Sequence, residues 1–204
     1  ARDHARVVRA EEDAGVGDVV VLRNLAERHV LRDRLNDVDA GTRRLSLQKK
    51  VGAGMTPETF REKIRQGEIG HVGLLESLYL MAHNLGFRID AVRETIDPVI
   101  MDRPLKTNYF NLKPGQVAGI KHIAEGISCG EKVITLDLRM YVGAESPHDS
   151  VRIEGIPEIN LRIEGGVAGD QATAAVLVNS IKPLIEATPG LATVKDLPSL
   201  HFYR

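Results

Sequence analysis

The chain has 204 residues, of which 43% are hydrophobic and 27% are charged, and its formal net charge is -1 at pH 7. This length and composition allow a folded domain with its own core, and the near-zero charge argues against nucleic acid or an anionic membrane as the main partner. The sequence has no run of 18 apolar residues and no apolar N-terminal segment, which argues against a transmembrane helix and a signal peptide. The one cysteine, Cys129, cannot form an internal disulfide and suits a reducing compartment, so we expect a cytoplasmic protein.

The chain is predicted to have two parts. Residues 1–36 are rich in Arg and Glu and are predicted as an N-terminal appendage, to which no role is assigned. Residues 37–204 are predicted as one α+β domain. Its first segment, 37–55, is basic and is predicted to be rich in turns, because three glycines interrupt any regular element. These are Gly41, Gly52 and Gly54.

Two helices are predicted between residues 56 and 86. Thr56 has the side chain of an N-cap and Pro57 suits the first helical position, so one helix begins here and is expected to end near Gly67. The second helix carries an apolar stripe and is expected to stop at Gly86, since glycine readily adopts the left-handed conformation of a C-terminal cap. The stripe consists of Leu74, Leu75, Leu78, Met81, Ala82 and Leu85.

Residues 87–163 are predicted as strands, because apolar and polar side chains alternate clearly over 134–142. Such alternation is typical of antiparallel strands with one face toward water. Residues 128–131 are predicted as a hairpin turn, and residues 170–187 as a helix with Asp170 as its N-cap. Strands grouped together, with helices before and after them, predict an α+β fold: a largely antiparallel or mixed sheet covered on one face by helices, without a doubly wound nucleotide-binding domain.

The glycine-rich stretches do not complete a dinucleotide-binding motif. The pairs Gly15–Gly17 and Gly52–Gly54 both lack the third glycine and neither follows a strand, so both are predicted as turns. Residues 165–170 form a glycine loop ahead of a helix, which can bind an anion through backbone N–H groups. A carboxylate at Asp170 occupies such donors, so a tight turn with a cap is the favoured interpretation.

Three residues are candidates for a polar site. The adjacent guanidinium groups of Arg43 and Arg44 can bind a carboxylate or a phosphate, and a solvated basic face is the alternative. His71 precedes the second predicted helix, where the helix dipole favours a neutral imidazole that can orient a polar substrate. A capping or packing role is the alternative for this histidine. The other histidines lack the spacing of a metal site, and Cys129 has no neighbouring His or cation to activate it as a nucleophile.

Seven blocks of the sequence resemble the C-terminal domain of 2,4-diaminopentanoate dehydrogenase, in collinear order over about residues 38–198. This family lies among the dihydrodipicolinate-reductase-like oxidoreductases and includes related native amine dehydrogenases. The blocks are GTRRLSLQKKVGAGMTPETF, GHVGLLES, ETIDPVI, KPGQVAGI, EKVITLDLRMYVGAESP, IEGIPEINLRIEGGVAGDQATAAVLVNSI and PGLATVKDLP.

The resemblance implies an enzyme in which an N-terminal Rossmann domain holds NAD or NADP. Residues 37–204 correspond to the α+β domain that binds the substrate and forms a homodimer. The implied reaction is oxidative deamination of an amine or diamino acid to a ketone, or reductive amination in reverse. The family's acid/base candidate belongs to the N-terminal half, so catalytic and cofactor-binding residues stay unassigned here. The implied substrate contacts are Arg43, Arg44, Gln48 and His71.

Two hypotheses follow from the resemblance. In the first, the chain is the substrate-side domain of such a dehydrogenase; the Rossmann domain would need about 130 to 150 further residues upstream. This chain alone would then bind no cofactor and would be inactive. In the second, it is a stand-alone, non-catalytic binding or oligomerisation module derived from that domain. Neither hypothesis involves a metal ion, nucleic acid or a membrane.

Overall fold

The computed structural model describes residues 6–13, 40–107 and 109–198. Residues 1–5 and 14–36 of the predicted appendage, including the predicted turn at Gly15–Gly17, therefore lie outside the described residues. None of the described helices is long and apolar enough to cross a membrane. In chain order the elements are β1 (Arg6–Asp13), α2 (Ala40–Lys50), α3 (Pro57–Arg65), α4 (Gly73–Leu85), β2 (Ala91–Ile100), β3 (Leu105–Lys106), β4 (Asn111–Leu112), β5 (Val117–Ser128), β6 (Glu131–Tyr141), β7 (His148–Glu154), β8 (Ile159–Glu164), α5 (Gly169–Glu186) and a short 3-10 helix (Val194–Asp196).

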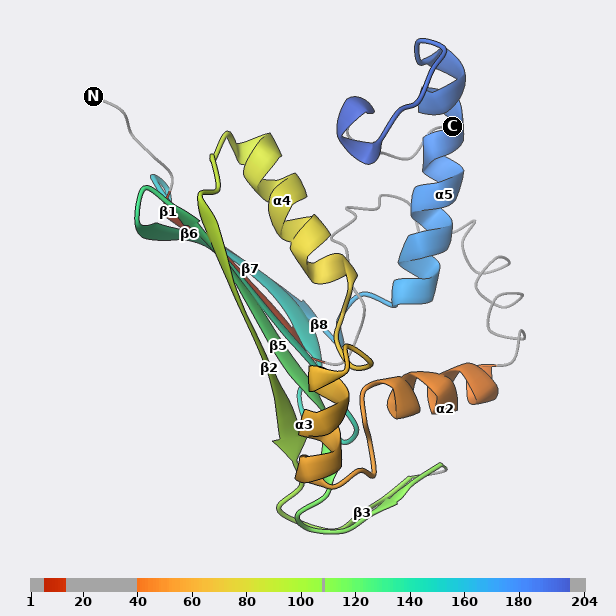
Figure 1. The fold of residues 1–204 in the computed structure, drawn as a ribbon. Coiled ribbons are helices and arrows are strands. Elements are labelled where there is room, and N and C mark those ends of the chain that lie inside the picture. Colours follow the sequence, from red (N-terminus) through yellow and green to blue (C-terminus); the bar gives the residue numbers. More distant parts are fainter. Residues whose placement is uncertain (1–5, 14–39, 108, 199–204) are drawn as a thin grey trace.

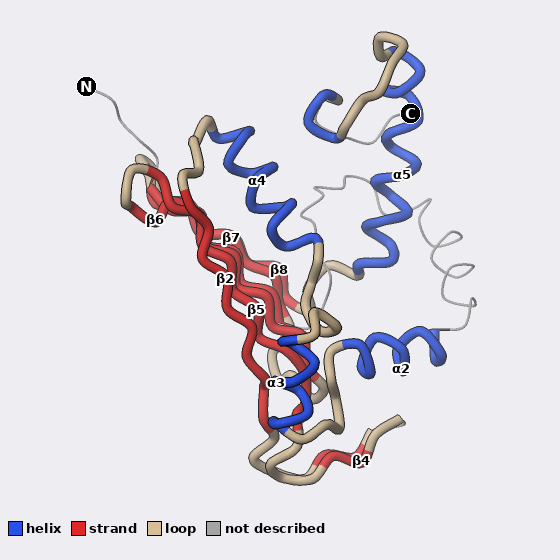
Figure 2. The backbone as a smooth tube through the Cα atoms, in the orientation of Figure 1, coloured by secondary structure: helices blue, strands red, loops and turns tan. Residues whose placement is uncertain are grey.

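A six-stranded mixed sheet forms the framework, with the strand order β2-β5-β6-β1-β7-β8. β1 runs parallel to β6, whereas the other neighbouring strands of this sheet are antiparallel. Strands β3 and β4 pair in a small separate sheet. The described helices all lie on one side of the large sheet (Figures 1 and 2). The predicted fold class, an α+β fold with a mixed sheet covered on one face, is therefore confirmed.

The main core lies between the sheet and the helices α3 and α4. Leu78 and Ala82 of α4 pack with Ala124 of β5 and Ile134 of β6. Phe60, the buried residue of α3, packs in a second cluster with residues of β5. Phe60 and Leu78 are both 0% exposed, and complete burial of such a side chain contributes about 2 kcal/mol to folding. The apolar spacing of α4 thus explains which face of this helix meets the sheet.

The opposite face of β5 carries a cluster of ion pairs. Along β5, Ala124 packs under α4, and the next residue, Glu125, points to the other side because side chains alternate along a strand. Lys132 and Arg93 lie 2.8 Å and 3.4 Å from the Glu125 carboxylate. The hydrogen bond from Lys132 is the main reason that the pKa of Glu125 lies below its ordinary value. These ion pairs fit the predicted polar side of β5. On β6 the prediction of one face toward water is wrong for the middle of the strand, because Thr135 and Asp137 are only 5% and 7% exposed.

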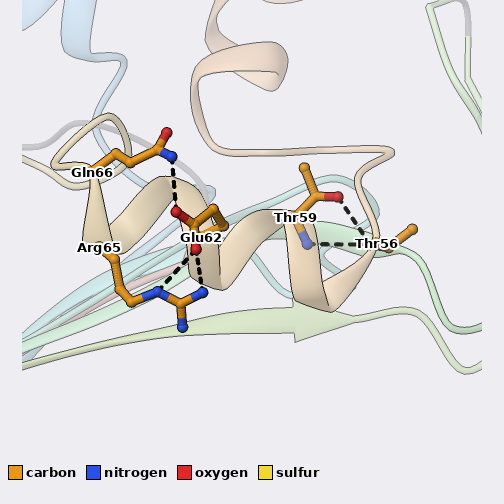
Figure 3. A network of polar contacts seen from close by, with 5 residues as sticks. All are labelled: Thr56, Thr59, Glu62, Arg65 and Gln66. Atoms are coloured by element: carbon orange, nitrogen blue, oxygen red, sulfur yellow. Dashed lines mark hydrogen bonds and ion pairs between the residues drawn. The ribbon is translucent and has the colours of Figure 1, made fainter.

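The ends of α3 follow from local sequence. The Thr56 hydroxyl accepts a hydrogen bond from the Thr59 N–H at 3.3 Å and caps the helix, as predicted. In the last turn the Glu62 carboxylate accepts hydrogen bonds from the side chains of Arg65, at 3.0 Å, and Gln66, at 2.9 Å (Figure 3). The helix ends at Arg65, close to the predicted stop at Gly67.

Two predicted turns also form as expected. Gly86 ends α4 in the left-handed conformation, with φ 73°. Residues 128–131 connect β5 and β6, and Ser128 pairs directly with Glu131 across the hairpin. The two central residues, Cys129 and Gly130, have φ values of 51° and 78°, the positive values that a tight two-residue hairpin needs.

The prediction of an irregular segment over residues 37–55 is wrong for its middle part, where residues 40–50 form α2. Gly41 lies in the first turn of this helix, and one glycine costs a helix only about 1 kcal/mol. Irregular structure begins after Lys50, where Gly52 and Gly54 have φ values of 82° and 86°. A glycine near a helix end therefore did not have the breaking effect that we expected.

The prediction that Asp170 caps the last helix is also wrong. Helix α5 begins at Gly169, and Ala168 holds the extended conformation of the cap position. Asp170 is thus the second helical residue. An alanine side chain has no oxygen to accept a backbone hydrogen bond, so α5 has no side-chain cap.

β1 lies in the middle of the large sheet, between β6 and β7. Val8 pairs with Ile134 on one side and with Ile153 on the other. Residues 6–13 therefore belong to the same sheet as the strands of the predicted α+β domain. The division of the chain at residue 36 stays a prediction.

Gly119 is required by the close approach of β5 and β6, and its replacement by alanine tests this. A Cβ atom at Gly119 would lie 2.0 Å from the Met140 carbonyl oxygen and 2.5 Å from the Tyr141 Cα. Both atoms belong to the backbone and cannot turn aside, so we expect Gly119→Ala to destabilise the chain by about 3 kcal/mol, measured by urea denaturation. Gly115→Ala is the control: its φ is 84° and no atom lies within 4 Å, so about 1 kcal/mol of backbone strain is expected. Equal losses in both variants would contradict the steric argument.

Candidate functional site

His71 lies in the loop between α3 and α4, and two hydrogen bonds fix its backbone. Its N–H donates to Nδ1 of His122 at 3.1 Å. Its carbonyl oxygen accepts from the Leu74 N–H at 3.1 Å, in the first turn of α4. Two residues earlier, Ile69 is 5% exposed and packs with Phe60 in the core. The loop is therefore attached to the sheet, the core and α4 immediately around His71.

The His71 side chain is half-buried. Its ring lies beside Gly73, where a Cβ atom would come within 3.4 Å of the ring Cε1 and 3.7 Å of Nδ1. Glycine at this position leaves room for the ring at the start of α4. An imidazole that is partly exposed can donate or accept a hydrogen bond with a bound molecule, so this placement is compatible with the predicted substrate contact.

His122 is a site residue that our reading of the sequence missed. It is 1% exposed, on the helix-facing side of β5. Since Nδ1 accepts from the His71 N–H, the neutral ring carries its proton on Nε2, which lies 2.7 Å from Oε1 of Glu94 on β2 and donates to it. The available signal was a histidine at an inward-facing position, between Ile120 and Ala124 in an alternating strand.

Gln48 lies in the second half of α2 and is half-buried. Its Oε1 is buried and has no hydrogen-bond partner among the described residues. The turn that follows α2 contacts the segment before His71, because a Cβ atom at Gly52 would lie 3.4 Å from Ile69 Cδ1. The structure thus connects the end of α2 with the His71 loop, which are neighbours in Figure 1. A buried amide oxygen without a donor is a place where a ligand N–H group can bind.

Arg43 and Arg44 lie in the first half of α2, and the structure describes only their backbone. Positions 44 and 48 are four residues apart, so they lie on the same face of this helix. Three of the four predicted substrate contacts are therefore on α2, and the fourth, His71, lies on the neighbouring loop. The contact of these side chains with a substrate remains a prediction.

Two described glycine turns, at residues 52–54 and 165–167, lie against other groups of the chain. Cβ positions at Gly52 and Gly54 face the side chains of Phe60 and Phe110, at 2.6 Å and 3.5 Å, so this turn is filled by the chain's own core. At the loop before α5, a Cβ atom at Gly166 would lie 3.6 Å from the carboxylate of Asp149. This carboxylate accepts from the Val167 N–H at 2.6 Å, so one backbone donor of the loop is already occupied.

Three further features were candidates for a site: a metal-binding cluster, Cys129 and a surface hollow. Among the described residues, no group of three or more His, Cys, Asp or Glu side chains could hold a metal ion. Cys129 is exposed in its hairpin turn. A hollow of about 540 Å³ lies between the end of α5 and the following segment, and it is lined by residues from Pro183 to Pro198 and by none of the predicted site residues.

Comparisons with known proteins identify the family. Residues 19–203 match the model of the 2,4-diaminopentanoate dehydrogenase C-terminal domain, and the chain belongs to this family. It is 33% identical over 159 residues to the 2,4-diaminopentanoate dehydrogenase of Acetoanaerobium sticklandii, with 75% of this chain and 45% of that protein covered. It is 32% identical over 140 residues to the amine dehydrogenase of Streptomyces virginiae, with 58% of this chain and 39% of that protein covered.

The fold is also similar to that of a solved structure, the amine dehydrogenase from Mycobacterium smegmatis. The TM-score is 0.68 at 22% sequence identity, and the match covers 98% of this chain and 53% of that one. At this identity the likeness shows a shared fold. The chain spans about half the length of the proteins it matches. The resemblance found in the sequence is therefore confirmed for the C-terminal domain.

Proposed function

We propose that the chain is the substrate-side domain of an NAD(P)-dependent oxidoreductase. The complete enzyme would oxidatively deaminate an amine of the 2,4-diaminopentanoate type, or reductively aminate the ketone. The family match over residues 19–203 carries this proposal. The nicotinamide, bound by a domain outside this chain, would accept or supply the hydride.

The candidate residues would each bind a different group of such a substrate. Gln48 offers a buried acceptor oxygen without a partner among the described residues, and an amine N–H of the substrate is a suitable donor for it. Arg43 and Arg44 are suited to a carboxylate, which a diamino acid has and a simple amine lacks. The position of His71, on a loop fixed to the sheet, supports a role in orienting the reacting group.

His71→Ala tests the proposed contact in an enzyme completed by a cofactor domain. We expect kcat/KM for 2,4-diaminopentanoate to fall about ten- to a hundredfold, because an orienting side chain is lost, while the unfolding midpoint of the chain changes little. His83→Ala, an exposed histidine on α4, is the control and is expected to leave the kinetics unchanged. A drop in stability without a kinetic defect would instead support a packing role for His71.

A titration with NADPH tests whether the cofactor site lies outside this chain. We expect no saturable binding to the isolated chain below about 1 mM, since at the turn of residues 52–54 the side chains of Phe60 and Phe110 lie against the glycines. Fluorescence or calorimetric titration measures this. Binding in the low micromolar range would contradict the assignment of the cofactor to another domain.

The alternative is a non-catalytic binding or oligomerisation module. One observation favours it: α5 exposes apolar side chains along one face, with Leu177 68%, Ile181 54% and Ile185 79% exposed. Apolar surface of this kind is typical of protein interfaces. The two functions differ in whether the completed enzyme turns over an amine. The kinetics of the His71→Ala variant test this directly.

Under both functions we propose that the chain forms a homodimer. Sedimentation equilibrium is expected to give twice the 22.4 kDa mass of one chain. The exposed apolar face of α5 supports association. A monomer at all concentrations up to about 100 μM, where even weak association becomes measurable, would overturn this part of the proposal.

A further inference from the structure

His122 is a polar side chain on an otherwise apolar strand face. Its neighbours on the helix-facing side of β5 are Ile120 and Ala124, which are 1% and 0% exposed. Burial of an imidazole among such side chains costs free energy unless its two nitrogens are hydrogen-bonded. An aliphatic side chain would suit this position by packing alone, so the hydrogen bonds account for a histidine here.

The two ring nitrogens have different partners. Nδ1 accepts from the backbone N–H of His71 at 3.1 Å, and Nε2 lies 2.7 Å from Oε1 of Glu94. Because the Glu94 carboxylate can only accept, it fixes the tautomer in which Nδ1 is free to accept from the loop. Glu94 lies on the edge strand β2 with 38% of its side chain exposed. A chain of two hydrogen bonds therefore runs from this edge of the sheet to the backbone of His71.

The loop needs this attachment because of its own sequence. His71 has Gly70 on one side, with φ 156°, and Gly73 two residues later. Segments with glycines sample many backbone conformations, so local preference alone does not fix the direction of the His71 side chain. The bond from His71 to His122 joins residues 51 positions apart and adds an attachment to the sheet to the local bond between the Leu74 N–H and the His71 carbonyl oxygen.

We propose that His122 and Glu94 are positioning residues for the substrate contact of His71. His122 holds the His71 backbone, and Glu94 holds the His122 ring in the tautomer that can do so. This inference rests on the proposed function, because it takes His71 as a residue that contacts an amine substrate.

Amide hydrogen exchange in the 204-residue chain tests the positioning bond. We expect His122→Leu to speed exchange at the His71 amide at least about tenfold, while the Phe87 amide, which is bonded to the Ala82 carbonyl at 2.8 Å, keeps its rate. Equal acceleration at both amides would show a general loss of stability and would overturn the inference.

Two variants at Glu94 test the same hydrogen bonds if His122→Leu does not fold. Glu94 lies on a partly exposed edge strand, so its replacement disturbs folding less than replacement of a buried residue. Glu94→Leu removes the acceptor for Nε2–H and is expected to speed exchange at the His71 amide. Glu94→Gln keeps a carbonyl oxygen for the same hydrogen bond and is the matched control, with exchange close to that of the original chain. Unchanged exchange in Glu94→Leu would overturn the role of Glu94.

A double-mutant cycle tests the link to substrate. The dissociation constant for 2,4-diaminopentanoate is measured by NMR titration in the same chain. We expect His122→Leu to weaken binding about tenfold, and to have no further effect when His71 is already alanine, because His122 acts through the His71 side chain. Equal weakening in both backgrounds would overturn the inference. If His71→Ala alone leaves binding unchanged, the proposed substrate contact fails, and exchange at the His71 amide still reports separately whether His122 holds the loop.

Discussion

Strand β5 is the element on which both the core and the candidate site depend. Each of the three buried clusters among the described residues includes residues of this strand. Ala124 lies in the cluster under α4, Ala118 in a cluster with Leu112 and Val142, and Val117 with Ile120 in the cluster of Phe60. Small residues make this possible. At Gly119 the neighbouring backbone leaves no space for a Cβ atom. Close packing of helices and strands on β5 is therefore the constraint from which the rest of the fold follows.

The same strand connects the core with the His71 loop. His122 is buried on β5 and bonded to the backbone of His71, and Ile69 of the loop packs in the cluster that contains Ile120. A candidate contact residue is thus held by a buried side chain of the sheet. Sites supported in this way keep their geometry better than sites on free loops, which suits a residue that has to orient a reacting group.

Membership of the family and the layout of the domain fit together. The chain matches the C-terminal domain of 2,4-diaminopentanoate dehydrogenase over residues 19–203, and it covers less than half of the two curated relatives. In the described residues, candidate polar positions gather on α2 and the His71 loop. The glycine turn at 52–54 faces core side chains, and the loop at 165–167 is bonded to the Asp149 carboxylate. This arrangement supports the division proposed here, with substrate contacts in this domain and the dinucleotide in another.

The sequence by itself determined the features that depend on neighbouring residues: the Thr56 cap, the Gly86 stop and the hairpin at 128–131, together with the alternation that predicts the sheet. It also carried the family resemblance and hence the candidate contacts. The tertiary structure alone decided the hydrogen bonds of His122, whose partners lie 51 and 28 positions away, and the place of β1 beside β6. Caps and turns are set by local hydrogen bonds and φ values, whereas a buried histidine gains partners for both of its ring nitrogens only when folding brings distant residues together.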